Sequence, residues 1–348
     1  MIVYWLILLI PALALLHPSR VDFNLQKILL WAFGLVLILA IGFRHEVGGD
    51  WYRYLFVHSY LDTGTFIQNF KWNDAGYELF YWISMHVFNS IYFANFASAI
   101  VFVFGLIRFC QIMPMPWLAL FVSIPFLVVV VAMGYTRQAA ALGMFMFALV
   151  SLIKEKRINF YILIFLGAVL FHKSLLITIF IDFFYNRKKL GILSIIALVL
   201  FVSVFVIWIL PLFKHLIYYY VTTQFHHSEG AVIRVVMSTF AGIIFFIFRK
   251  RFKRTFHDEN LWLIFSLVSI ALLPLAFSYS TFIDRIAIFF IPLQLVIFSR
   301  VPMLIYSTYY RTIFIVATIT LYVCVLFVWL NFAKHAYLWV PYKNILLE

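Results

Sequence analysis

Apolar residues fill the chain in long continuous runs, separated by short polar stretches. Continuous runs favour α-helices over the alternating strands of a β-barrel, and many runs approach the roughly 20 residues that cross a bilayer. We therefore predict an all-α, polytopic integral membrane protein that forms a single transmembrane domain over residues 1–348, with about twelve crossings. The predicted crossings are 1–17, 28–42, 91–107, 117–133, 137–153, 158–171, 174–185, 191–210, 232–248, 261–280, 284–299 and 313–330.

The region 44–90 interrupts this pattern between two predicted crossings. Its apolar stretch 76–88 would make a helix about 20 Å long, too short to cross a core of about 30 Å. The stretch 50–61 mixes aromatic and charged residues, as an amphipathic helix at a membrane surface does. We expect 44–90 to be an extracytoplasmic (periplasmic) loop with two interfacial helices, and 211–231 to be a second loop on the same side.

Charge distribution sets the orientation. The chain is 66% hydrophobic and 11% charged, with a formal net charge of +13. The basic residues gather in short clusters between apolar runs, at 154–157, 187–189 and 249–254. Cytoplasmic loops of membrane proteins carry such clusters, so we read them as topology signals and not as a nucleic-acid surface. This orientation predicts that both chain ends lie outside.

Several polar residues are predicted to meet at the opposite, outer face. The stretch FRHEVGGDWYRY at 43–54 contributes Arg44 and Asp50, and Glu78 follows in GYELFYWI. Three arginines lie at or near the outer ends of later apolar helices. An arginine at bilayer depth costs several kcal/mol unless it faces water or a partner, so these positions are candidates for function. The three are Arg137, Arg234 and Arg285. Gln138, the next residue after Arg137, belongs to the same candidate site.

The residue types indicate a site for a phosphorylated lipid. Arginine binds phosphate oxygens with two parallel hydrogen bonds and keeps its charge. His172 is a candidate general base, while Asp50 and Glu78 could orient a histidine or bind sugar hydroxyls. The alternatives are helix-end arginines that reach the surface, a histidine that only packs, and carboxylates that pair with Arg44 or Arg53.

Sequence signatures of metal and nucleotide sites are absent. The chain has no Asp-x-Asp, His-Glu-x-x-His or Cys-x-x-Cys, no Walker A sequence and no dinucleotide fingerprint. We therefore expect no metal and no cofactor.

The order of these motifs resembles the EpsG family of Wzy-type polysaccharide polymerases. The motifs are FR-x-x-x-G-G-D-W-x-x-Y from Phe43, GYELFYWI from Gly76, TRQAAALG from Thr136, LFHKSLL from Leu170 and DRIAIFFIPLQ from Asp284. Where relatives often have Gly-Thr-Asp-Tyr, this chain has Gly49, Asp50 and Trp51, with Gly48 in front.

The resemblance implies a glycosyltransferase of the GT-C type in the bacterial inner membrane, with its active site facing the periplasm. It would join undecaprenyl-diphosphate-linked oligosaccharide units into O-antigen, capsule or exopolysaccharide. Its partners would be those lipid-linked glycans and membrane lipids, with a flippase and a chain-length regulator as candidate protein partners. Two alternatives stay open: a transporter (flippase) of lipid-linked oligosaccharides, and a glycan ligase or acyltransferase.

Overall fold

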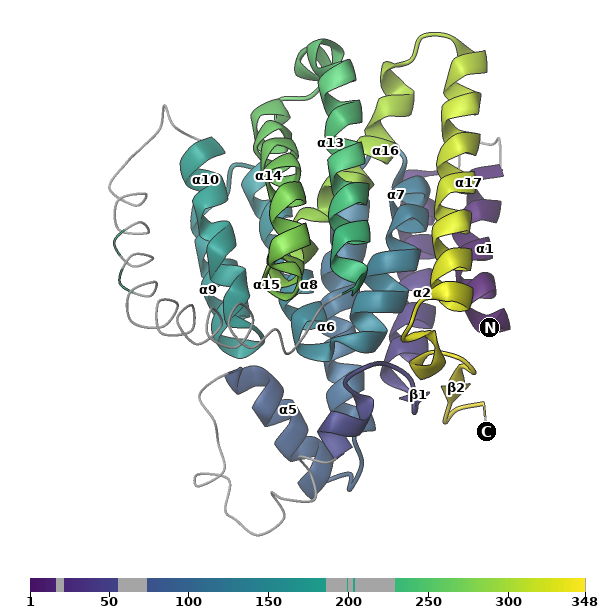
Figure 1. Cartoon of the computed structure of the whole chain (residues 1–348), viewed down its shortest axis with the longest axis vertical. Coiled ribbons are helices and arrows are strands. Elements are labelled where there is room, and N and C mark those ends of the chain that lie inside the picture. The colour runs from purple at the N-terminus through teal and green to yellow at the C-terminus, as the bar shows by residue number, and fades with distance from the viewer. Residues whose placement is uncertain (17–21, 56–73, 186–198, 200–202, 204–228, 348) are drawn as a thin grey trace.

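The apolar runs fold as helices that pack side by side in one bundle (Figure 1). The computed structural model describes residues 1–16, 22–55, 74–185, 199, 203 and 229–347. Two short strands pair antiparallel, Arg44 opposite Asn344, and every other regular element is helical within the described ranges. The predicted all-α class is confirmed.

The helices are α1 (Ile2–Leu16), α2 (Phe23–Gly42), α5 (Ala75–His86), α6 (Tyr92–Cys110), α7 (Pro116–Ser123), α8 (Thr136–Ile153), α9 (Arg157–Leu170), α10 (Phe180–Tyr185), α13 (Glu229–Thr255), α14 (Glu259–Ser278), α15 (Ser280–Ala287), α16 (Pro292–Leu304) and α17 (Thr308–Phe332). A π-helix, Ile124–Ala132, continues α7. Lys173–Ile179, Ile288–Phe290 and Ala336–Leu338 are 3₁₀-helices. The strands are β1 (Arg44–His45) and β2 (Lys343–Asn344).

Among the described residues, fewer helices qualify as membrane spans than the twelve crossings predicted for the whole chain. Six helices of the described chain are long and apolar enough to cross a bilayer: α2, α6, α8, α13, α14 and α17. A seventh span results if the pair Ser280–Phe290 and Pro292–Leu304, bent by 41°, crosses as one unit. The predicted twelve crossings are therefore not confirmed.

Specific segments account for the difference. Ile2–Leu16, Pro116–Ala132 and Arg157–Leu170 are apolar helices of less than 18 residues. The predicted crossing 174–185 consists of a 3₁₀-helix followed by the six-residue α10. The predicted crossing 191–210 and loop 211–231 lie outside the described residues, apart from residues 199, 203 and 229–231.

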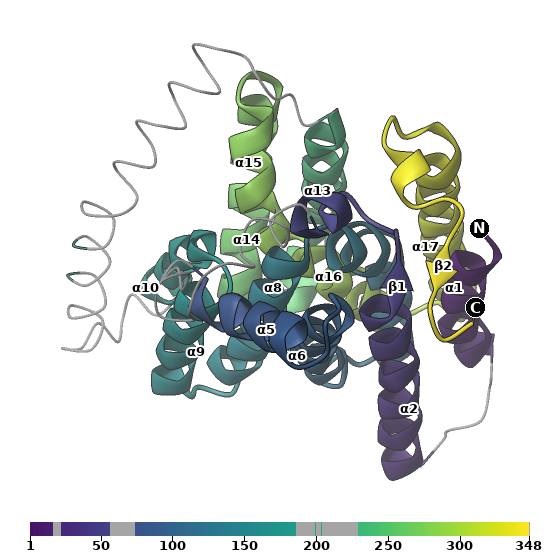
Figure 2. The ribbon, with the colours of Figure 1, turned by 90° about the horizontal axis from the view of Figure 1, so that it is seen from below.

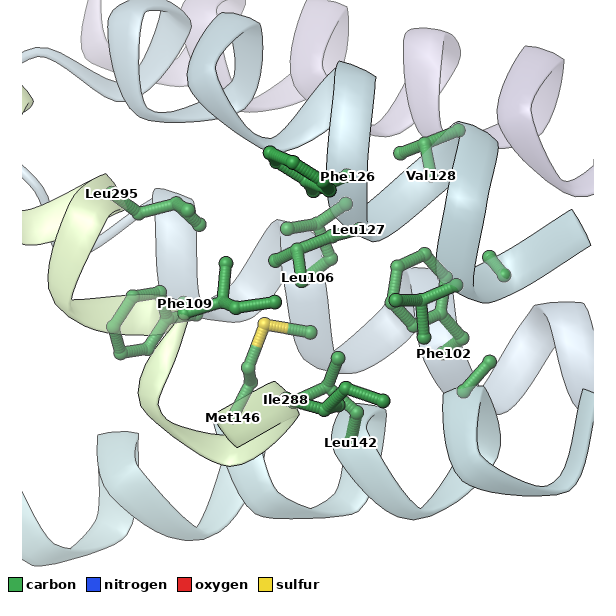
Figure 3. Close-up of a cluster of buried hydrophobic side chains, with 14 of the residues drawn as sticks. Phe102, Leu106, Phe109, Phe126, Leu127, Val128, Leu142, Met146, Ile288 and Leu295 are labelled. Carbon is green, nitrogen blue, oxygen red and sulfur yellow. The ribbon is translucent and has the colours of Figure 1, made fainter. Parts of the chain in front are cut away.

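The packed core of the bundle is centred on α6 and α8. Gly105 and Gly143 bring the two backbones together, because a Cβ on Gly105 would lie 1.9 Å from the Gly143 carbonyl oxygen. Figure 3 shows Phe102 and Leu106 of α6 facing Leu142 and Met146 of α8. Side chains of the π-helix and of Ile288–Leu304 close the cluster around them. This core gives α8 a rigid support from its first turn onward.

Helix α5 lies across one end of the bundle (Figures 1 and 2). Its 12 residues make a helix about 18 Å long, too short to cross a membrane. Gly76 of α5 packs directly on Leu170 at the end of α9. The predicted short helix at 76–88 is confirmed, while its place at the membrane interface stays a prediction. Of the predicted helix 50–61, residues 51–55 are helical and 56–73 lie outside the described residues.

A C-terminal strap, residues 333–347, holds the Gly-Gly-Asp stretch at this same end. Strand β2 pairs with β1, and the Gly48 amide donates to the Leu338 carbonyl at 2.8 Å. The Trp339 ring lies on Gly134, where a Cβ would be 2.5 Å from it. The Asp50 amide in turn donates to the Gly134 carbonyl at 3.2 Å. The strap thereby fixes the position of Asp50 relative to the start of α8.

This arrangement predicts different effects of alanine at two adjacent glycines. Gly48 has φ +106°, and its Cβ would meet the Met133 carbonyl oxygen at 1.9 Å. A Cβ on Gly49 would find its nearest neighbour at 3.8 Å. Gly48→Ala should therefore destabilise the protein by about 2 kcal/mol or more, and Gly49→Ala only slightly. Thermal unfolding of the two purified variants in detergent measures the difference; equal stability would contradict the packing described.

Candidate functional site

The predicted site residues lie at the end of the bundle that carries α5 and the strap. Arg137 is in the first turn of α8, and His172 lies between α9 and the 3₁₀-helix Lys173–Ile179. The basic clusters occupy the opposite ends of the same helices: Lys154 ends α8, and 249–254 ends α13. The 18 residues of α8 separate the two ends by about 27 Å. We call them the polar end and the basic end.

Arg137 is held at the polar end by an acid and two aromatic rings. Its Nη1 lies 2.9 Å from an Asp74 carboxylate oxygen, just before α5. Its guanidinium carbon lies 5.7 Å from the Tyr54 ring centroid and 5.6 Å from that of Tyr77. The Tyr77 hydroxyl is buried and has no hydrogen-bond partner in the described structure. The ion pair and the two rings orient the Arg137 side chain. The side chain is still accessible, because 27% of its surface is exposed.

Asp50 lies beside this group and accepts a hydrogen bond from Tyr54 at 3.0 Å. Burial raises the pKa of the Asp50 carboxyl, while the Tyr54 hydroxyl and the positive charge of Arg137 act in the opposite direction. Neither Arg44 nor Arg53 forms an ion pair with Asp50 in the described chain, contrary to the surface-pair alternative. Asp50 is thus a half-buried carboxylate, and its surroundings make it more basic than an exposed aspartate.

His172 caps the 3₁₀-helix Lys173–Ile179. Its Nδ1 accepts from the Ser174 amide at 3.3 Å and lies 2.6 Å from the Ser174 hydroxyl oxygen. Burial, and then the positive charges of Arg285, Arg137 and Lys173, lower the pKa of His172 to about 3. The imidazole is therefore neutral throughout the physiological pH range.

Arg285 and Lys173 supply positive charge that no acid neutralises directly. No carboxylate lies within ion-pair distance of either side chain in the described part of the protein. Asp284, the neighbour of Arg285, pairs instead with Arg234 of α13, 3.0 Å away. Arg285 is half-buried, so its guanidinium is partly shielded from water. Such a position favours a multiply charged anion.

Arg234 lies in the second turn of α13 and is 3% exposed. It donates to the Gly230 carbonyl at 3.2 Å and pairs with Asp284, while its Nη1 has no partner among the described residues. The Tyr135 hydroxyl is close enough to feel the charges of Arg234, Asp284 and Asp50. The Arg234–Asp284 pair therefore lies near Asp50 at the polar end.

Arg44 has a different environment from the other arginines. It is 1% exposed and donates to four protein acceptors: the carbonyls of Ile41 and Val47, and the side chains of Asn95 and Thr136. It therefore joins the end of α2 to α6 and α8. Because it is buried and four of its five N–H groups have protein acceptors, we assign Arg44 to structure and leave it out of the proposed diphosphate site.

The remaining predicted residues flank the cluster. Gln138 follows Arg137 on α8 and is partly exposed, and Glu78 lies in the first turn of α5, one turn after Asp74. The candidate site predicted from sequence did not include Asp74, Tyr54 or Lys173. Tyr54 could have been found from its spacing of four residues after Asp50, which places both on one helix face. Asp74 could not, because its partner is 63 residues away.

In the described ranges, no three His, Cys, Asp or Glu side chains gather closely enough to hold a metal ion. The polar end therefore offers cations, a neutral imidazole and carboxylates as its chemical groups.

Comparison with known proteins gives one match. No curated protein and no solved structure matches the chain significantly. A family model, EpsG, matches residues 27–344, which include all the predicted site residues and most of the strap. That family consists of proteins related to Wzy-like polysaccharide polymerases, and the match covers the five motifs that carried the resemblance. The chain belongs to the EpsG family.

Proposed function

We propose that this protein is a glycosyltransferase that polymerises undecaprenyl-diphosphate-linked oligosaccharide units on the periplasmic side of the bacterial inner membrane. Family membership supports a membrane role in polysaccharide biosynthesis. The observation that carries the finer proposal is the unneutralised pair Arg285 and Lys173 beside His172, at the end of the bundle that also holds Asp50.

The charges of the polar end suit a lipid diphosphate. The donor would be a growing glycan on its lipid diphosphate, bound through Arg285 and Lys173, with Arg137 at the rim. The acceptor would be a single lipid-linked unit. The glycosidic bond forms as the bond from the donor's anomeric carbon to the phosphate oxygen breaks, and that oxygen leaves with the electron pair. Donors already in place stabilise this developing charge, often the largest catalytic contribution. We propose a GT-C-like arrangement in which the additional, shorter apolar helices complete the membrane domain.

The acceptor hydroxyl must lose a proton, and Asp50 is our candidate to receive it. A buried carboxylate is a stronger base than an exposed one, and the Tyr54 hydrogen bond orientates it. Glu78 and Gln138 flank the cluster and are candidates to bind sugar hydroxyls.

The orientation rests on charge asymmetry between the two ends. The clusters 154–157 and 249–254 lie at the basic end, and basic loops stay in the cytoplasm. The polar end then faces the periplasm. In a variant without Cys324, a cysteine replacing the exposed Tyr52 should react with an impermeant thiol reagent in intact spheroplasts, and one replacing Lys253 should not. The reverse pattern would overturn the orientation.

The diphosphate proposal predicts that Arg285 tolerates neither alanine nor lysine. Arg285→Ala should reduce polymer yield by about a hundredfold or more, because a donor to the leaving oxygen is lost. Arg285→Lys should reduce it by about tenfold, since lysine keeps the charge but loses the two-pronged geometry. Polymer length and yield would be measured in cells whose own copy of the gene is deleted, with membrane abundance measured alongside.

The matched control is Arg254, an exposed arginine at the basic end. Arg254→Ala and Arg254→Lys should leave yield unchanged. Full-length polymer at normal yield from Arg285→Lys would exclude two-pronged binding by this residue.

The assignment of Asp50 predicts a pH dependence. A base must be ionised, so the rate should fall as pH falls through the pKa of Asp50, which burial places above that of an exposed aspartate. Tyr54→Phe keeps the ring against Arg137 but removes the hydrogen bond that lowers this pKa, so the acid side of the profile should move to higher pH. Asp50→Asn should lose about a hundredfold or more in the pH range where the wild-type Asp50 is ionised.

These profiles would be measured on membranes supplied with lipid-linked units. Tyr52→Phe, at a neighbouring exposed position, is the control and should leave the profile in place. An unshifted acid limb in Tyr54→Phe, or an active Asp50→Asn, would remove Asp50 as the base.

A further inference from the structure

The hydrogen bonds of His172 determine which of its nitrogens carries the proton. The Ser174 backbone N–H points at Nδ1 from 3.3 Å, and a backbone N–H can only donate. Nδ1 must therefore present its lone pair. The Ser174 hydroxyl, 2.6 Å away, can donate to the same nitrogen. Both contacts come from one residue at the start of the 3₁₀-helix, so the local fold itself selects the tautomer.

The surroundings of His172 also oppose a second proton on the ring. Arg285 on α15, Arg137 on α8 and the adjacent Lys173 all act on the imidazole with positive charge. The nearby acid Asp74 forms an ion pair with Arg137 and also interacts electrostatically with Lys173. An imidazolium would add a fourth positive charge to this group without gaining a carboxylate partner. The ring is thus neutral, with its proton on Nε2.

We propose that His172 is a neutral hydrogen-bond donor that contacts the leaving diphosphate through Nε2–H, with Ser174 as the residue that positions it, and that it is not the general base. The inference rests on the proposed function for the identity of the acceptor. It replaces the role expected from sequence, in which a histidine near neutral pH would take up a proton. Nδ1, the only nitrogen able to accept one, is directed at Ser174.

The proton and electron accounting of the step is then complete without any proton transfer to or from His172. The acceptor hydroxyl forms the new bond to the anomeric carbon and gives its proton to Asp50. The bond from that carbon to the phosphate oxygen breaks, and the oxygen keeps the electron pair. Nε2–H donates a hydrogen bond to this oxygen and stays on the ring, while Arg285 and Lys173 balance the charge.

Two amide substitutions separate a donor from a base. The glutamine side-chain nitrogen reaches the place of Nε2, whereas the shorter asparagine reaches only that of Nδ1. Neither amide accepts a proton at neutral pH. A donor role predicts that His172→Gln keeps polymer formation within about tenfold of wild type and that His172→Asn loses about a hundredfold. Protein abundance would be measured for both. Equal large losses at normal abundance, or no loss in either variant, would overturn the proposal.

A measurement without substrate tests the tautomer by itself. Nitrogen-15 NMR of the purified, histidine-labelled protein identifies the His172 signal by its loss in His172→Gln. We expect the Nε2-protonated form, unchanged between pH 5 and pH 8. Ser174→Ala should keep this tautomer, because the backbone N–H of residue 174 still donates to Nδ1. A proton on Nδ1, or titration near neutral pH, would contradict the inference. The expected tautomer in a protein that lengthens no glycan would instead contradict the proposed function and the assigned acceptor.

Discussion

The cost of placing charge inside an apolar bundle governs the polar features of this protein. A buried guanidinium that lacks a partner is destabilising by several kcal/mol, so buried arginines come with acceptors. The described structure follows this rule at both ends. The pairs are Arg137 with Asp74, Arg157 with Asp182, Arg234 with Asp284 and Arg300 with Asp258. Arg44 meets the same requirement with carbonyl, amide and hydroxyl oxygens.

Arg285 departs from this rule, and that departure locates the candidate site. It is half-buried, has no ion-pair partner within the described ranges, and shares its surroundings with Lys173 and a neutral histidine. Anions at this position would reduce the electrostatic cost of the cluster, which gives a physical reason for a phosphate group to bind there. The glycines and the strap serve the same site, because they hold Asp50 against the start of the helix that carries Arg137.

Much of the helical fold and part of the site could be predicted from the sequence. Long apolar runs specify helices by local pattern alone, and arginines at the ends of those runs indicated the end where Arg137, Arg234 and Arg285 lie. Contacts between distant residues left no such pattern. The strap reaches the Gly-Gly-Asp stretch through Trp339 and β2, nearly 300 residues along the chain. Short apolar segments were also ambiguous, since length alone does not separate a span from a 3₁₀-helix such as Lys173–Ile179.

Reconstitution of the purified chain into proteoliposomes tests the central claim most directly. The liposomes would contain undecaprenyl-diphosphate-linked repeat units, with no nucleotide sugar and no ATP. The account predicts a ladder of products that differ by one repeat unit, with one lipid diphosphate released for each linkage formed, and a much shorter ladder from Arg285→Ala. A folded wild-type protein that moves these lipids across the bilayer but never lengthens the glycan would contradict it.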